Sequence, residues 1–129
     1  KNLVTDTKGK IVACCRNPES SDGLNTFLAG LPESERSRVL PISMDLEDQA
    51  SITSAAERIK SGFERIDMLL NVAGLLGDGK NTPGPERSIA KMERDWMEKT
   101  FSVNVFGPVM FSKELAPLMA QRKRGKKSD

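Results

Sequence analysis

The stretch that decides the fold is Ile66-Asp67-Met68-Leu69-Leu70-Asn71-Val72-Ala73-Gly74. It is an almost continuous apolar run that ends in an asparagine and two small residues. Such a run is typical of a strand in a parallel sheet, because helices cover that kind of strand on both faces. We therefore predict a strand over residues 66–72 that ends at Ala73 and Gly74.

Two similar apolar runs lie upstream, at residues 10–15 and 38–44. The first is closed by Pro18, and Pro41 within the second indicates a strand at the edge of a sheet. Helical patterns separate the three runs. An alternation of strands and helices predicts an α/β fold with a parallel sheet.

The segments between the predicted strands carry apolar residues at helical spacing. The first predicted helix starts at Ser21 or Asp22 and presents Leu24, Phe27, Leu28 and Leu31 on one face. The second follows Asp48, a candidate cap, and buries Ile52, Ala55, Ala56, Ile59 and Phe63.

The part of the chain after Gly74 is predicted to hold one loop and one helix. Residues 75–90 are rich in glycine, proline and polar groups and are expected to form a long loop. Residues 91–121 show a long helical pattern, in which we expect a bend at Gly107-Pro108.

Composition bounds the class of protein. With 129 residues, 29% of them charged and 37% apolar, the chain fits one soluble globular domain. The net charge of +2 gives no reason to expect a nucleic-acid or membrane partner, and the basic run at residues 122–127 has no interleaved aromatic residues to stack bases. We expect a cytoplasmic protein, with an organelle left open because the amino terminus looks cut.

The residue types limit the chemistry. The chain has no histidine and no tyrosine, the side chains that most often transfer protons near neutral pH. Cys14 and Cys15 are adjacent, a spacing that suits no common metal site, so we predict no metal. We expect both cysteines to be reduced strand residues, with a vicinal disulfide as the alternative.

The order of the motifs resembles the short-chain dehydrogenase/reductase family, in particular its carbonyl-reductase-like, C-factor-like branch. The resemblance implies a Rossmann-like, doubly wound parallel sheet, of which this chain would hold the second to fourth strands and the helix after the fourth. Residues 1–129 would then be a single partial NAD(P)-binding domain, truncated at both ends. The motifs fall at strand ends, where open parallel sheets bind dinucleotides.

The same resemblance implies cofactor-binding residues after the first two strands. Arg16 and Asn17 stand where the family reads the adenosine ribose, and a guanidinium there would bind a 2′-phosphate, which favours NADP over NAD. Asp45 would accept a hydrogen bond from the adenine, with the Leu46 backbone nearby. The alternatives are a solvated arginine in a turn and a carboxylate at a helix entry.

Three further residues and one catalytic candidate follow from the resemblance. Asn71 would steady the sheet, while Ala73 and Gly74 would let the cofactor ribose lie against the backbone. Val72 departs from the family, which usually has a second asparagine there. Asn104 would hold a water of the proton relay; the alternative is an exposed or backbone-bonded asparagine.

The family also has a glycine-rich turn before these motifs and a Tyr-x-x-x-Lys pair after them, which this sequence lacks. We therefore expect part of an NADP(H)-dependent oxidoreductase that moves hydride between nicotinamide and a carbonyl or alcohol substrate, inactive and marginally stable as an isolated chain. One alternative is an inactive truncated form that binds a second subunit through the helix from Lys91, which could also form a homo-oligomer. Another is a flavodoxin-like or receiver-like module that uses Asp45 as an acceptor.

Overall fold

The computed structural model describes residues 3–76 and 88–120. The chain divides into two compact units, Lys1–Asp45 and Leu46–Asp129, and each has its own packing. Most of the loop expected at residues 75–90 and the basic run at 122–127 lie outside the described residues. Only η1 (Ile89–Lys91), a short 3-10 turn, is described near the end of that loop.

The first unit contains a parallel pair of strands, β1 (Ile11–Cys15) and β2 (Val39–Ser43). The register runs from Ile11 opposite Val39 to Cys15 opposite Ser43. Beyond the last paired residues, the Met44 amide still donates to the Cys15 carbonyl at 2.9 Å. Both strands and their parallel direction confirm the prediction from the apolar runs.

Three helices accompany these strands: α1 (Leu3–Asp6), α2 (Asp22–Ala29) and α3 (Glu33–Arg36). The predicted α2 is present, but none of its side chains is buried. The Arg38 guanidinium joins the residues around α1 to β2 by donating to three carbonyl oxygens, those of Val4 at 2.6 Å, Thr7 at 3.0 Å and Gly9 at 2.9 Å.

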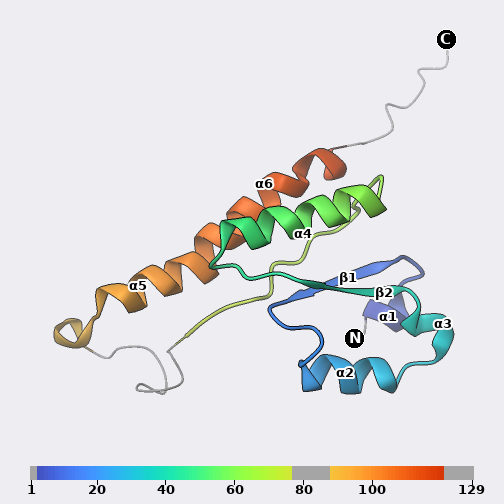
Figure 1. The fold of residues 1–129 in the computed structure, drawn as a ribbon, viewed down its shortest axis with the longest axis horizontal. Helices are drawn as coiled ribbons and strands as arrows, with labels where there is room; N and C mark the ends of the chain where they lie inside the picture. Colours follow the sequence, from blue (N-terminus) through green and yellow to red (C-terminus); the bar gives the residue numbers. More distant parts are fainter. Residues whose placement is uncertain (1–2, 77–87, 121–129) are drawn as a thin grey trace, which may run out of the picture. The chain divides into compact units, whose positions relative to one another are not determined.

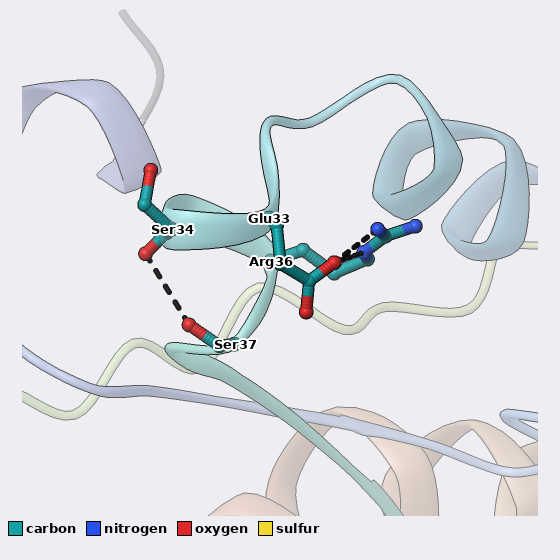
Figure 2. Close-up of polar contacts among 4 residues, drawn as sticks. All are labelled: Glu33, Ser34, Arg36 and Ser37. Atoms are coloured by element: carbon teal, nitrogen blue, oxygen red, sulfur yellow. Dashed lines mark hydrogen bonds and ion pairs between the residues drawn. The ribbon is translucent and has the colours of Figure 1, made fainter.

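The short helix α3 was not predicted, because four residues are too few to show a periodic apolar pattern. Local polar contacts hold it (Figure 2). The Arg36 guanidinium pairs with the Glu33 carboxylate one turn earlier, and the Ser37 hydroxyl donates to the Ser34 carbonyl at 3.4 Å.

The second unit is built on two long helices, α4 (Gln49–Gly62) and α6 (Gly107–Met119), which lie side by side (Figure 1). The Asp48 carboxylate caps α4 by accepting from the Ala50 amide at 2.9 Å, as predicted. The core of this unit consists of Ile52, Ala55, Ala56 and Ile59 from α4 with Phe111 and Leu115 from α6. The predicted buried stripe of α4 is therefore confirmed, apart from the half-buried Phe63 at its end.

The long helix predicted for residues 91–121 is wrong in its details. Helix α5 (Arg94–Phe101) is followed by a π-helical turn, η2 (Ser102–Phe106), and then by α6. The irregularity therefore precedes the expected bend at Gly107. Gly107 itself lies so close to Leu46 that a Cβ there would be 2.5 Å from the Leu46 carbonyl oxygen and 2.7 Å from its Cβ.

The strand predicted at residues 66–72 is not formed, and this prediction was wrong. A strand requires a neighbour that accepts its backbone hydrogen bonds, and no described residue pairs with this segment as a strand. The segment is also not buried by other residues of the described chain, since the Met68 side chain is 66% and the Val72 side chain 88% exposed. Instead it runs back along α6, where the Ile66 amide donates to the Leu118 carbonyl at 3.2 Å (Figure 1).

Candidate functional site

Side chains of α6 and η2 hold the extended segment at its carboxyl end. The Asn71 side-chain amide donates to the Ser112 hydroxyl at 3.2 Å, and that hydroxyl donates to the Pro108 carbonyl at 2.7 Å. The hydroxyl of Ser112 thus accepts one hydrogen bond and donates another, which fixes its rotamer. This contact ties Asn71 to the first turns of α6.

Asn104 makes the second attachment, four residues further along the segment. Its Oδ1 accepts from the Leu75 amide at 2.7 Å and its Nδ2 donates to the Leu75 carbonyl at 2.9 Å. The side-chain amide therefore bonds both backbone groups of one residue, as a neighbouring strand would. Asparagine is unfavourable within a regular helix, and here it lies in the π turn, a feature that often occurs at functional sites.

Ala73 and Gly74 lie between these two attachments and are exposed. A Cβ at Gly74 would meet only Asn104 Oδ1, at an ordinary 3.8 Å, and the Gly74 backbone is outside the left-handed region. The described contacts of the chain therefore do not explain why a glycine is needed at this position. The second unit thus places Asn71, Ala73 and Gly74 beside η2, which carries Asn104, and the first turns of α6, which carry Ser112.

The first unit places Arg16 and Asn17 in the exposed turn that follows β1. The Ser43 hydroxyl at the end of β2 donates to the Arg16 carbonyl at 2.8 Å. Within the described part of the chain, no carboxylate forms an ion pair with the Arg16 guanidinium. A positive charge at this strand end is thus available to an anion.

Asp45 and Leu46 follow β2 after one intervening residue, Met44, and are half-buried. Asp45 is the last residue of the first unit and Leu46 the first of the second. In the second unit the backbone of Leu46 is covered by Gly107.

The cysteines are structural. Cys14 and Cys15 are free and half-buried in β1, as expected. Burial, and then electrostatic repulsion from the neighbouring Cys15, raises the pKa of the Cys14 thiol to about 11, so Cys14 stays protonated at neutral pH. No group of three or more potential metal ligands occurs among the residues described by the structure.

Three residues of this arrangement were not found from the sequence. Ser43, Ser112 and Gly107 act through contacts with residues 27, 41 and 61 positions away in the chain. Ser112 follows Phe111 and precedes two charged residues on α6, so no local pattern in the sequence indicated its contact. Gly107 was expected only as part of a bend with Pro108, and Ser43 carried no signal, because their partners become neighbours only after folding.

Comparison with known proteins identifies the family. The family model for short chain dehydrogenases matches residues 3–126. The chain belongs to the short-chain dehydrogenase family. The family that the resemblance implied is thereby confirmed.

Individual relatives agree with this assignment. Dehydrogenase/reductase SDR family member 7B of Mus musculus is 34% identical over 116 residues, which cover 90% of this chain and 33% of the relative. A carbonyl reductase from Pseudomonas aeruginosa is similar in fold, with a TM-score of 0.67 at 21% identity over 89% of this chain and 47% of that one. The NADPH-bound carbonyl reductase from chicken fatty liver has a TM-score of 0.64 at 23% identity, over 84% of this chain and 40% of that one.

The chain spans about a third of the length of three curated relatives that it matches. Its α/β elements accordingly correspond to part of the Rossmann fold of the solved relatives. None of the helices that the structure describes has the length and apolar character needed to cross a membrane.

Proposed function

We propose that this chain is the cofactor-side part of an NADP(H)-dependent short-chain oxidoreductase that acts on a carbonyl or alcohol substrate. In this proposal residues 1–129 form one partial NAD(P)-binding domain, and the enzyme that contains them supplies the glycine-rich turn and the tyrosine and lysine of the relay. The isolated chain is then inactive.

The observation that carries the proposal is the attachment of Leu75 to Asn104. It holds the backbone at Ala73 and Gly74 in an exposed, extended course next to a π turn. No described contact of the chain requires a glycine at position 74. A residue without a side chain at this position leaves the backbone accessible to a bound group, which agrees with the proposal. In the complete sheet that the proposal assumes, this motif would end a strand, and ligands of open α/β sheets bind at strand ends.

The assignment of NADP rests on Arg16. Its exposed guanidinium, without a carboxylate partner in the described residues, fits a 2′-phosphate, which it can bind bidentately. Asn17 follows in the same turn, and Asp45 with Leu46 would receive the adenine after β2. The similarity in fold to an NADPH-bound carbonyl reductase agrees with this choice.

When bound, the nicotinamide would supply or accept the hydride. The residues of this chain would bind and orient it: Arg16 at the 2′-phosphate, and Ala73 and Gly74 along the ribose. Asn104 would serve the proton relay. Beyond its bonds to Leu75, its amide keeps one N–H and one lone pair, with which it can also hold a water.

The first experiment is to determine the coding sequence on both sides of these residues and to express the complete protein. We expect NADPH to bind more tightly than NADH. Arg16→Asp should weaken NADPH binding about tenfold to a hundredfold, as expected for the loss of a charged hydrogen-bonded contact, and leave NADH binding nearly unchanged.

The matched control is Arg58→Asp, which makes the same charge change at an exposed arginine on α4. It should leave the ratio of NADPH to NADH affinity unchanged. An unchanged ratio in Arg16→Asp, measured by fluorescence titration with both cofactors, would contradict the NADP assignment.

A second candidate role, contact with another subunit, is favoured by exposed apolar side chains on α5, η2 and α6. Phe101 is 50%, Phe106 59% and Val109 59% exposed, which is costly for a surface in water. Size-exclusion chromatography of the complete protein and of a Phe106→Glu variant tests this role. A dimer that the variant dissociates supports it, whereas a wild-type monomer excludes it.

A further inference from the structure

Ser43 is the last residue of β2 and lies opposite Cys15, the last residue of β1. Its hydroxyl donates to the carbonyl of Arg16 at 2.8 Å, while the amide of the next residue, Met44, donates to the Cys15 carbonyl at 2.9 Å. The hydroxyl therefore continues the contacts between the two strands by one residue, beyond the point where backbone pairing stops.

This hydrogen bond restrains the turn that carries Arg16. It fixes the orientation of the peptide group between Arg16 and Asn17, because the carbonyl oxygen belongs to that planar group. On the other side, Pro18 restricts the backbone of Asn17 to extended conformations. The turn is thus restrained on both sides of Asn17, although it is exposed to solvent.

A restrained backbone matters for Arg16 because its side chain is long and exposed. Ordering such a side chain on an anion costs conformational entropy, and a fixed starting point reduces the number of conformations that must be lost. An alanine at position 43 would leave the Arg16 carbonyl to water and free the peptide group to rotate.

We infer that Ser43 is a positioning residue for cofactor selection: by holding the Arg16 carbonyl, it directs the guanidinium towards the 2′-phosphate that distinguishes NADPH from NADH. The inference rests on the proposed function. Ser43 acts through Arg16 and makes no contact of its own with the cofactor.

The test compares Ser43→Val with Ser43→Thr in the complete enzyme, because the two side chains have nearly the same shape and only threonine keeps the hydroxyl. Ser43→Val should raise the Kd for NADPH about threefold to tenfold, the effect of one neutral hydrogen bond. The Kd for NADH and the kcat with saturating NADPH should stay the same. Ser43→Thr should restore the NADPH affinity.

A second comparison separates this inference from the proposed function. In an Arg16→Ala background, Ser43→Val should have no further effect on the Kd for NADPH, because the hydroxyl acts through the guanidinium. If Arg16→Ala lowers the preference for NADPH and Ser43→Val does not, the inference about Ser43 is wrong while the NADP assignment stands.

Two other results would overturn the inference. If Ser43→Val weakens NADPH and NADH equally, together with a lower melting temperature, the hydroxyl has only a structural role. If Arg16→Ala itself leaves the ratio of the two affinities unchanged, both the NADP assignment and the role of Ser43 fail.

Discussion

Extended backbone is held in two different ways in this chain. In the first unit, β1 and β2 pair residue by residue through their own backbones, from Ile11 to Cys15. In the second unit, residues 66–75 lie along α6 and are attached at separate points, by the Leu118 carbonyl and by the side chains of Ser112 and Asn104.

The difference has consequences for stability. A backbone ladder is insensitive to most side-chain substitutions, since every peptide group contributes. A segment held by a few side chains depends on each of them, and local opening needs only the loss of one attachment. The residues proposed to face the cofactor, Ala73 and Gly74, belong to the second kind.

The largest effect is expected from Gly107→Ala, which disturbs the helix that carries the attachments. The new Cβ would be 2.5 Å from the Leu46 carbonyl oxygen, so α6 and residue 46 must move apart at a cost of about 1–3 kcal/mol. Denaturant unfolding of the complete protein measures this loss. The control is Gly62→Ala, where a Cβ meets nothing within 4 Å; equal stability of the two variants would contradict the prediction.

A smaller effect is expected from Asn104→Ala, which removes both hydrogen bonds to Leu75. We expect a loss of about 1–2 kcal/mol and faster hydrogen exchange at the Leu75 amide, with no change at the Met44 amide next to the β1–β2 ladder. Asn104→Asp sharpens the comparison, because it keeps the acceptor for the Leu75 amide but replaces the donor to the Leu75 carbonyl by an oxygen; the exchange rate at Leu75 should therefore lie between those of wild type and Asn104→Ala. Equal exchange rates at Leu75 in wild type and Asn104→Ala would show that the side chain is not what holds the segment.

The smallest effect concerns the ion pair between Lys60 on α4 and Glu114 on α6, whose Nζ and Oε2 atoms are 2.7 Å apart. The hydrogen bond from Lys60, and then its charge, lower the pKa of the Glu114 carboxyl below its ordinary value. The stability that this ion pair contributes is fully present above the ordinary carboxyl pKa and is lost as the pH falls through the lowered pKa of Glu114.

The corresponding measurement is the free energy of unfolding of wild type and Glu114→Gln between neutral pH and about pH 3. Wild type should be the more stable at neutral pH, and the difference between the two proteins should shrink towards the acidic end. A difference that is independent of pH would show that the pair contributes nothing through its charge.

Local patterns predicted the elements that depend on neighbouring residues. The prediction of α4 was correct for its cap, Asp48, and for its buried stripe, because capping and helical periodicity depend on residues only a few positions apart. The two strands of the first unit were also correct. The π turn at Asn104 was not predicted, because its hydrogen-bond pattern has no distinct residue signature.

The same apolar pattern led to a correct strand prediction at residues 11–15 and to a wrong one at residues 66–72. An apolar run shows that a segment favours burial, but a strand exists only when another strand presents free backbone groups beside it. In the candidate site, the motifs and their order along the sequence were enough to single out Arg16, Asp45, Asn71 and Asn104. The contacts of Ser43, Ser112 and Gly107 did not, since no local pattern encodes a partner so far away in the chain.

The sequence by itself determined the α/β class, the family, the helix and strand periods and the residue types available for cofactor binding, because these depend on composition and on short-range spacing. The tertiary structure alone decided that Leu75 is bonded to Asn104, that Asn71 is bonded to Ser112, and that the Arg16 carbonyl is held by Ser43. Those contacts join residues 27 to 41 positions apart, and only the packing of helices and strands brings such residues within hydrogen-bond distance.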